Sequence, residues 1–327
     1  MKEHLDNSII RYENNIFAID SHYLHPLMAA IHFIVEDGRV AIIDTGSNDS
    51  LPHVLGALTE LGLTPEAVDY VILTHVHLDH AGGAGLMMRY FPNARLVVHP
   101  RGAQHMIDPT KLIAGATLVY GADAMRRLYG EILPVPEARV IAAPHATIIK
   151  LAGRELLCLD TPGHAKHHIS IADRANTSAS TSVFTGDVFG ISYRELDSDG
   201  RQFLFPTTSP VQFDPEATHA SIDLICSLAP KVLYQTHFSE LRDVPAQAAH
   251  LHRMIDAHVA IAHGAASLGP AARYEGIRTG LTTLLLDETK RFGCTLEPAQ
   301  ALAIWGTDIA MNAQGLAVWL DHQKRES

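Results

Sequence analysis

Short apolar runs separated by turn residues open the chain and predict a β-meander. Residues 16–20, 31–36 and 39–43 each have the composition of a strand. Asp37 and Gly38 separate the last two runs, and this dipeptide favours the tight turn of a β-hairpin. The N-terminal part of the chain is therefore expected to form an antiparallel sheet.

Helical and strand patterns alternate through the middle of the chain. A helix is expected from His53 to Leu61, and it ends at Gly62, a residue type that commonly follows the last helical position. The remaining expected elements of this part are strands over 71–73 and 95–98, helices around 102–112 and 122–128, and a strand hairpin joined at Gly153. Strand clusters with helices between them indicate two sheets covered by helices, an α+β fold.

The pattern changes after His237, where strand signals disappear and apolar residues recur at helical spacing. The recurring positions are Leu251, Met254, Ile255, Val259, Tyr274, Ile277, Leu281, Leu284 and Leu285. Further apolar residues between Leu302 and Leu320 extend this pattern, with a break expected at Gly306. We therefore predict a sheet-containing domain over residues 1–240 and a helical C-terminal region over 241–327. Packing onto the first domain, a wall of the substrate pocket and a dimer interface are the roles considered for the helices.

A dense group of polar residues follows the apolar run 71–73. His75, His77, Asp79 and His80 place three imidazoles and one carboxylate within six residues. On an extended or tightly turned backbone, side chains two positions apart can face one point, so His75 and His77 are expected to hold one metal ion. Asp79 and His80 alternate out of this pair and are expected to serve a second ion nearby. Clustering of ordinary core or surface histidines is the alternative, because the chain contains 21 histidines.

Three more residues of ligand type each follow an apolar, strand-like run. They are His164, Asp187 and His237. Glycines directly before His164 and Asp187 allow the backbone to turn sharply at a strand end, so that the side chain can point into a shared site. The repeated order of strand and then ligand indicates one metal centre built from several loops.

The succession HxHxDH, Gly-His, Gly-Asp and a final His resembles the motif pattern of the metallo-β-lactamase superfamily over residues 15–240. The resemblance implies a four-layer αββα sandwich with a C-terminal helical appendage. It also implies two divalent ions, with zinc the expected metal and iron or manganese the alternatives. The implied ligands are His75, His77 and His164 for the first ion, Asp79, His80 and His237 for the second, and Asp187 as the bridge.

The same resemblance implies a supporting role for Asp44. This residue matches the superfamily's Asp-Thr-Gly element and would hold the histidine loop in place without binding metal. The full histidine set with a bridging Asp187 looks most like the hydrolases beside glyoxalase II. Antibiotic-hydrolysing members typically have Cys or Ser at the position of Asp187, and flavodiiron proteins usually have Glu at the position of His77.

The resemblance thus implies a binuclear metal-dependent hydrolase of a small ester, thioester or lactone. The reaction would use a metal-bridging hydroxide, with Asp79 as the catalytic residue that orients the attacking water. A metal-dependent phosphodiesterase and a non-catalytic ligand-binding protein of this fold are the alternatives.

Further residues are candidates for the substrate pocket. His22, His25, His99 and His105 lie in segments that the superfamily places near its metal cleft. Tyr193 begins a stretch that covers the cleft in the hydrolase subgroup, and it is expected either to assist a substrate oxygen or to pack in the structure. Surface or structural roles are expected for the histidines at positions 167, 168, 250, 252, 258 and 263.

Composition narrows the range of partners. The formal net charge is −11 with no long basic run, which argues against a surface that grips nucleic acid. No window is apolar enough to cross a bilayer, and the first residues lack an apolar export core, so a cytoplasmic protein with a small-molecule substrate is expected. Cys158, Cys226 and Cys294 are too widely spaced to predict a disulfide framework or a thiolate zinc site. A homodimer is left open.

Overall fold

The computed structural model describes residues 8–174 and 181–326, and the chain divides into two compact units. Unit 1 comprises the chain up to Asp160 together with His167–Gly186. Unit 2 comprises Thr161–Lys166 and the chain from Asp187 onward. Residues 1–6, on which the expectation about an export signal rests, lie outside the described part. The predicted domain boundary at residue 240 stays a prediction.

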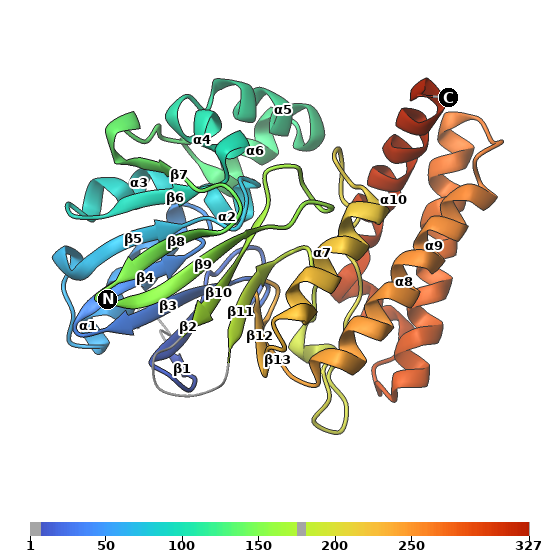
Figure 1. Cartoon of the computed structure of the whole chain (residues 1–327). Coiled ribbons are helices and arrows are strands. Elements are labelled where there is room, and N and C mark those ends of the chain that lie inside the picture. Colours follow the sequence, from blue (N-terminus) through green and yellow to red (C-terminus); the bar gives the residue numbers. More distant parts are fainter. Residues whose placement is uncertain (1–7, 175–180, 327) are drawn as a thin grey trace, which may run out of the picture. The chain divides into compact units, whose positions relative to one another are not determined.

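The first sheet of unit 1 begins as the expected meander. Its strands follow the order β1 (Ile10–Arg11), β2 (Ile16–Asp20), β3 (Ala30–Glu36), β4 (Arg39–Ile43), β5 (Val68–Ile72), β6 (Arg95–Val98) and β7 (Val140–Ala142). Strands β1 to β4 pair antiparallel, whereas β4 to β7 pair parallel (Figure 1). Asp37 and Gly38 both have positive φ in the β3–β4 turn, as a type I′ hairpin requires, so the hairpin prediction is confirmed.

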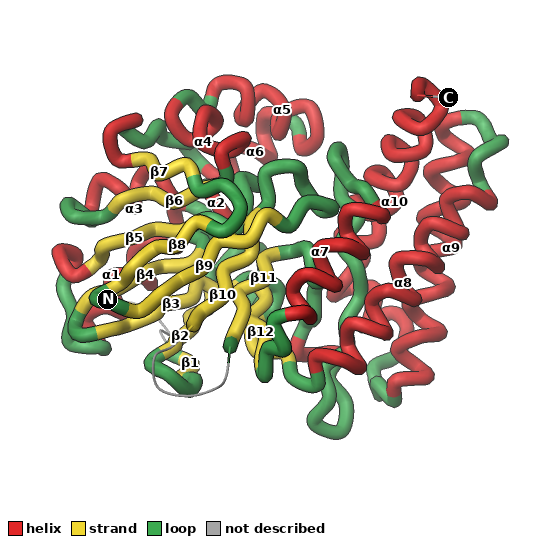
Figure 2. Tube along the Cα trace, viewed as in Figure 1, coloured by secondary structure: helices red, strands yellow, loops and turns green. Residues whose placement is uncertain are grey.

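The second sheet of unit 1 is antiparallel throughout. It contains β8 (Thr147–Leu151), β9 (Arg154–Asp160), β10 (Ile169–Arg174) and β11 (Ser182–Gly186) in sequence order. Gly153 has φ +94° in the turn between β8 and β9, where a hairpin was expected. The expected α+β class is confirmed, with two sheets accompanied by helices (Figure 2).

The first sheet is buried on both faces, and β3 shows how this arises. Ile31 and Phe33 belong to the apolar core that also contains Val54 and Leu58 of helix α1 (Leu51–Glu60). His32 alternates with them, and its ring lies 5.3 Å from that of Phe184 in β11. Since successive side chains of a strand point to opposite faces, one face of β3 packs against helices and the other against the second sheet.

Arg154 forms a buried ion pair within the second sheet and connects that sheet to the first. The Arg154 guanidinium on β9 donates to the Asp173 carboxylate on β10, with an Nη2···Oδ2 distance of 2.6 Å. It also donates through Nη1 to the backbone oxygen of Asn14 at 2.8 Å and to Glu36 Oε2 at 3.2 Å. Both Arg154 and Asp173 are buried, and each therefore depends on the other for compensation of its charge.

The connections between the parallel strands of the first sheet contain helices. These helices are α1, α2 (Leu78–Ala81), α3 (Ala84–Tyr90), α4 (Pro100–Ile107), α5 (Thr110–Tyr120) and α6 (Ala122–Tyr129). The single helix expected around 102–112 is wrong, because the helix ends at Asp108, which is extended, and a new one starts after Pro109. Proline disfavours helical backbone at the residue before it, which explains the interruption.

Unit 2 contains mainly helices. They are α7 (Pro215–Ser227), α8 (Val244–Gly264), α9 (Pro270–Phe292) and α10 (Pro298–Glu326), drawn from yellow to red in Figure 1. Strands β12 (Val232–Gln235) and β13 (Ser239–Leu241) pair antiparallel, so the expectation of no strand after His237 is wrong. The expected break at Gly306 is also wrong, since α10 runs through it and loses only about 1 kcal/mol to the glycine. None of the helices in the described residues is long and apolar enough to cross a membrane.

Candidate metal centre

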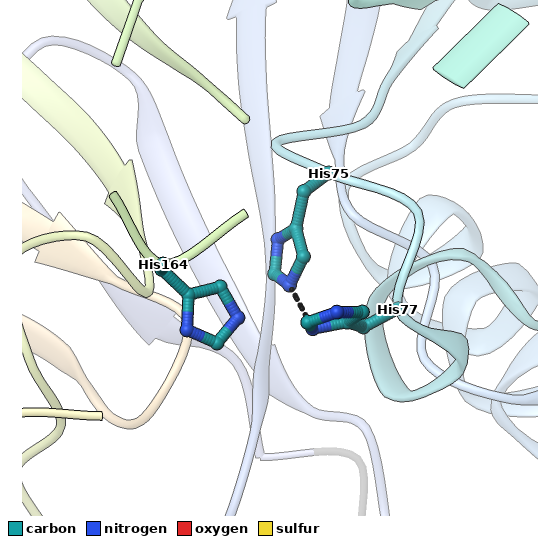
Figure 3. Close-up of side chains that lie close together, drawn as sticks. All are labelled: His75, His77 and His164. Atoms are coloured by element: carbon teal, nitrogen blue, oxygen red, sulfur yellow. Dashed lines mark hydrogen bonds between the residues drawn. The ribbon is translucent and has the colours of Figure 1, made fainter. Parts of the chain in front are cut away.

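The histidine loop, defined as residues 74–80, leaves β5 and enters the short helix α2. His77 is still extended, with φ −63° and ψ 148°, and it caps the N-terminus of α2. On this non-helical backbone His75 Nε2 lies 3.0 Å from His77 Nδ1, which Figure 3 marks with a dashed line. The sequence spacing of two therefore brings two ring nitrogens together, as expected for ligands of one ion.

Asp79 and His80 lie in the first turn of α2 beside this pair. His80 Nε2 is 3.6 Å from Asp79 Oδ2, and the His80 ring centroid is 4.0 Å from that of His75. The His80 side chain is fully buried, whereas that of Asp79 is 21% exposed. Unit 1 thus contributes four ligand-type side chains in one cluster, arranged as two adjacent pairs.

Asp44 holds this loop in the way that its predicted supporting role requires. Its carboxylate accepts hydrogen bonds from the Thr74 backbone N–H at 2.8 Å and from the Thr74 hydroxyl at 2.9 Å. It also accepts one from His80 Nδ1 at 2.8 Å. With its proton on Nδ1, His80 presents the Nε2 lone pair as a metal ligand.

Unit 2 contributes three further ligand-type side chains from loops. His164 lies in the segment Thr161–Lys166 after β9, Asp187 directly follows β11, and His237 follows β12. His164 is also drawn in Figure 3. Gly163 before it has φ +136°, and an added Cβ there would lie 2.5 Å from the Thr218 backbone, so only glycine fits.

Asp187 directs one carboxylate oxygen toward each of the two ligand-type histidines of unit 2, His164 and His237. Its Oδ2 lies 3.6 Å from His164 Nε2, and its Oδ1 lies 3.7 Å from His237 Nε2. The other ring nitrogen of His164, Nδ1, is 2.8 Å from the Thr207 hydroxyl, which orients the ring. All three ligand-type side chains are buried.

The donor chemistry and the spacing fit divalent metal ions. Two nitrogen or oxygen ligands bound about 2.0–2.1 Å from a tetrahedral zinc ion lie about 3.3 Å from each other. The distances of 3.0–3.7 Å between paired ligand atoms within each unit are close to this value. The three distances of 3.6–3.7 Å exceed those of most direct hydrogen bonds, which are shorter than 3.2 Å, and therefore suit shared ions better.

A model of the metallo-β-lactamase superfamily matches residues 26–237 of the chain, which contain every one of these ligand-type residues. The chain belongs to the metallo-β-lactamase superfamily. It is 25% identical over 215 residues to the uncharacterized protein YobT of Bacillus subtilis, a match that covers 64% of this chain and 83% of YobT. It is 28% identical over 212 residues to the hydroxyacylglutathione hydrolase of Xanthomonas campestris, covering 64% of this chain and 61% of that enzyme.

A solved structure of a metallo-β-lactamase family protein supports the fold over most of the chain. The metallo-β-lactamase family protein TTHA1429 of Thermus thermophilus aligns with a TM-score of 0.61 and 20% identity, over 95% of this chain and 94% of that protein. The expected sandwich with a C-terminal helical region is therefore confirmed. The metal-binding roles of individual residues stay predictions.

The predicted pocket histidines of this superfamily member have different surroundings within unit 1. His22 is exposed and stacks on His53 with ring centroids 3.7 Å apart, and His25 Nδ1 contacts a backbone oxygen. His99 is buried and caps α4, since its Nδ1 accepts from the backbone N–H of Arg101 at 3.0 Å. His105 is half-buried. Their contribution to a substrate pocket stays a prediction.

Tyr193 of unit 2 is fully buried. Its hydroxyl lies 3.2 Å from each carboxylate oxygen of Asp308 on α10, and its ring packs on Phe205. These contacts give Tyr193 the packing role that was one of its two expected interpretations. A further contact with substrate stays a prediction.

Two tyrosines that were not predicted as site residues lie beside the histidine loop. The Tyr23 and Tyr129 hydroxyls lie 2.6 Å apart in unit 1, with their rings stacked. Burial, followed by the negative charge of Asp79, raises the pKa of Tyr129 above its usual value, so its hydroxyl stays protonated. Neither tyrosine belongs to a sequence motif, and only the fold brings them near Asp79.

His167 and His168 have the structural role expected of them, but in direct contact with the histidine loop. His167 Nδ1 accepts from the Val76 backbone N–H at 3.4 Å, and burial lowers the pKa of His167 to about 3. The His168 ring centroid lies 5.2 Å from that of His75. Gly186 allows this packing, because its φ is +51° and an added Cβ would lie 2.6 Å from His168 Nε2 and 2.7 Å from Thr74 Cβ.

Proposed function

We propose that this protein is a binuclear metal-dependent hydrolase of a small ester, thioester or lactone. The observation that carries the proposal is the position of Asp187 in unit 2. Its two oxygens face His164 and His237 separately, as a carboxylate that bridges two ions would. A carboxylate that binds a single ion would be expected to direct its oxygens toward the ligands of that one ion.

The proposed ligand sets are those that the family resemblance implies. His75, His77 and His164 would hold the first ion, while Asp79, His80 and His237 would hold the second. Zinc is the proposed metal, because imidazole and carboxylate ligands suit it, with iron or manganese as alternatives. When bound, the two ions supply a lowered water pKa and polarise the oxygen of the scissile carbonyl.

The residues of the chain position the attacking water and the metal ligands. Asp79 accepts a hydrogen bond from the attacking water and orients it, using the carboxylate edge that is 21% exposed. Asp44 keeps His80 in the tautomer that leaves Nε2 as a ligand. Tyr129 stays protonated beside Asp79, since its raised pKa prevents ionisation at neutral pH.

A carbonyl substrate is proposed on two grounds. The relative from Xanthomonas campestris is named for hydrolysis of hydroxyacylglutathione, whose acyl group is attached through a thioester. Alkoxide and thiolate leaving groups of esters, lactones and thioesters also need little protonation, so the reaction does not depend on a dedicated acid. The net charge of −11 favours a small molecule over nucleic acid. A cytoplasmic location stays a prediction.

The test combines metal analysis with turnover. Metal content per chain is measured on purified protein, and hydrolysis of a thioester, a lactone and a phosphodiester is compared for the wild type, Asp187→Ala and the control Asp287→Ala. Asp287 is an exposed carboxylate on α9 of the same unit. We expect two ions per wild-type chain and a fall in kcat/KM for a carbonyl substrate of at least about 1000-fold in Asp187→Ala alone.

Other outcomes would replace the proposal. Preferential hydrolysis of the phosphodiester, with equal dependence on Asp187, would establish the phosphodiesterase instead. Near-zero metal and no turnover after reconstitution with zinc, iron and manganese would establish a ligand-binding protein.

A further inference from the structure

Helices α7 and α8 of unit 2 carry the same short pattern on their facing sides. His219 and Asp223 lie four residues apart on α7, and His252 and Asp256 lie four residues apart on α8. A spacing of four places both members of each pair on one face of a helix. The two helices pack against each other, so the pairs meet. We call these four residues the His–Asp cluster.

The contacts within the His–Asp cluster are crossed and symmetric. His219 Nε2 lies 3.2 Å from Asp256 Oδ1, and His252 Nε2 lies 3.2 Å from Asp223 Oδ1. The rings are stacked, with centroids 4.8 Å apart and planes 15° from parallel. Their remaining nitrogens, Nδ1 of His219 and Nδ1 of His252, face each other at 2.6 Å.

Protonation determines what this arrangement can bind. An ionised carboxylate only accepts hydrogen bonds, so each Nε2 that contacts an aspartate carries the ring proton. A neutral imidazole has only one N–H, so each Nδ1 then carries an unprotonated lone pair. Two lone pairs 2.6 Å apart repel unless a cation lies between them. That cation is either a shared proton or a metal ion.

We propose that the His–Asp cluster binds one first-row transition-metal ion, of the zinc class, through the two Nδ1 atoms. Metal-binding histidines commonly donate their other N–H to a carboxylate, which fixes the ring and increases the basicity of the ligand nitrogen. Here both histidines have such a carboxylate, each supplied by the opposite helix. This crossed support distinguishes the cluster from two surface histidines that merely happen to be close.

The exposure of the cluster is compatible with the remaining coordination positions. Both histidine side chains are 28% exposed, so water can complete a four-coordinate ion. Two nitrogen ligands of a tetrahedral ion lie about 3.3 Å apart, so the rings must separate by about 0.7 Å from their 2.6 Å contact. Half-exposed side chains can make such a movement without disturbing a packed core.

The proposed site shares no residue with the metal centre of the proposed function. Its ligands come from α7, which ends at Ser227, and from α8, which begins at Val244, so an ion between them would clamp α7 to α8. Because such an ion binds the folded pair and not the separated helices, it should raise the temperature of unfolding. The two sites can therefore be tested separately.

The experiment compares the full-length wild type with His219→Gln, His252→Gln and the control His263→Gln. His263 is an exposed histidine on α8. Each protein is saturated with Zn²⁺, passed over a desalting column, and analysed for zinc per chain, zinc-dependent Tm and hydrolysis. We expect His219→Gln and His252→Gln each to lose one zinc equivalent and at least half of the zinc-induced rise in Tm. Hydrolysis should stay within about twofold of the wild type, and His263→Gln should behave as the wild type does.

Two results would overturn the proposal. Equal zinc content and equal Tm response in all four proteins would show that the cluster binds no metal. NMR titration that detects a proton shared by His219 and His252, with no change of their signals on addition of Zn²⁺, would assign the cluster to a proton. If hydrolysis fails altogether in the wild type, the zinc and Tm readouts still decide the proposal.

Discussion

The histidine loop of unit 1 and the His–Asp cluster of unit 2 bring imidazoles together in two different ways. In the histidine loop, His75 and His77 are two residues apart on a strand-end backbone. In the His–Asp cluster, each histidine lies four residues before an aspartate on a helix, and the partner histidine comes from another helix. The local backbone conformation therefore decides which sequence spacing is informative.

The carboxylates that support the two groups differ in burial. Asp44 is 1% exposed and accepts from both Thr74 and His80. Asp223 and Asp256 are each 75% exposed and contact one histidine each. A buried carboxylate cannot be replaced by water, whereas an exposed one can. The comparison predicts rigid, sensitive geometry in the loop and adaptable geometry between the helices.

The largest expected effect is a loss of stability on substitution of Gly186 at the strand end. Gly186→Ala places a methyl group against His168 and Thr74 at a position with φ +51°. Positive φ and overpacking together should lower the free energy of unfolding by about 3 kcal/mol. Gly306→Ala, inside helix α10 with open space around it, should instead raise it by about 0.5–1 kcal/mol. Urea denaturation measures both, and a similar sign for the two would refute the contrast.

The next effect concerns pH and the buried His258 on α8. His258 Nδ1–H donates to the Met254 backbone oxygen, and burial lowers the pKa of His258 to about 4 from an ordinary value of 6.5. Between these two pH values the unfolded chain binds a proton that the folded chain does not, so stability falls as the pH decreases from 6.5 to 4. The free energy of unfolding lost in this way is about 3 kcal/mol at most, and the loss occurs mainly below pH 6.5.

The variant His258→Leu isolates this contribution. The difference in unfolding free energy between His258→Leu and the wild type should shift in favour of the variant as the pH is lowered from 7 to 4. His263→Leu, an exposed substitution on the same helix, is the control for a general effect of removing a histidine. A difference that does not change with pH would show that His258 has the same pKa in the folded and the unfolded chain.

A smaller effect is expected on removal of the buried supporting charge. Asp44→Asn keeps an acceptor for Thr74 but weakens the interaction with His80, which should lower zinc affinity by about 10–100-fold. Competition with a chelator measures this affinity. Asp69→Asn is the control, because Asp69 lies on β5 of the same sheet and pairs with Arg39. Unchanged affinity in Asp44→Asn would show that the loop orders itself without the carboxylate.

The smallest effect is expected at the exposed supporting charge of the His–Asp cluster. Asp223→Asn should lower zinc affinity at the cluster by less than about 10-fold, because water and the amide oxygen replace a carboxylate that is already 75% exposed. Isothermal titration calorimetry with Zn²⁺ on the full-length protein provides the value. If Asp223→Asn lowered zinc affinity as much as Asp44→Asn does at the histidine loop, the buried and the exposed carboxylates would not differ in how strongly they hold their histidines.

Local patterns were sufficient to predict much of the fold and the candidate ligands. The β3–β4 hairpin follows from Asp37 and Gly38, and the histidine loop follows from four ligand types in close succession after a strand. Each of these features depends on residues within about ten positions of one another. The repeated order of strand and then ligand extended the prediction to His164, Asp187 and His237, and the family resemblance then implied which ion each would bind.

Features that depend on distant contacts were missed. Tyr23 and Tyr129 are separated by 106 residues, and the two histidines of the His–Asp cluster by 33, so only folding brings them together. The strand β13 is too short, at three residues, to give a periodic signal. Gly306 was expected to end a helix, but packing of α10 along α9 and α8 outweighs the local preference of one glycine.

The segment Thr161–Lys166 has a consequence for how this gene can be divided. These six residues belong to unit 2, although the chain on both sides of them belongs to unit 1. Backbone contacts of Gly163 with Asp214, and of Pro162 with Ser221, anchor the segment to α7 and the residue that caps it. No single cut of the chain separates the units, and a fragment starting at Asp187 would lack His164. Because the units alternate at three junctions along the chain, recombination can exchange them between relatives only by three crossovers, which favours their inheritance as one piece.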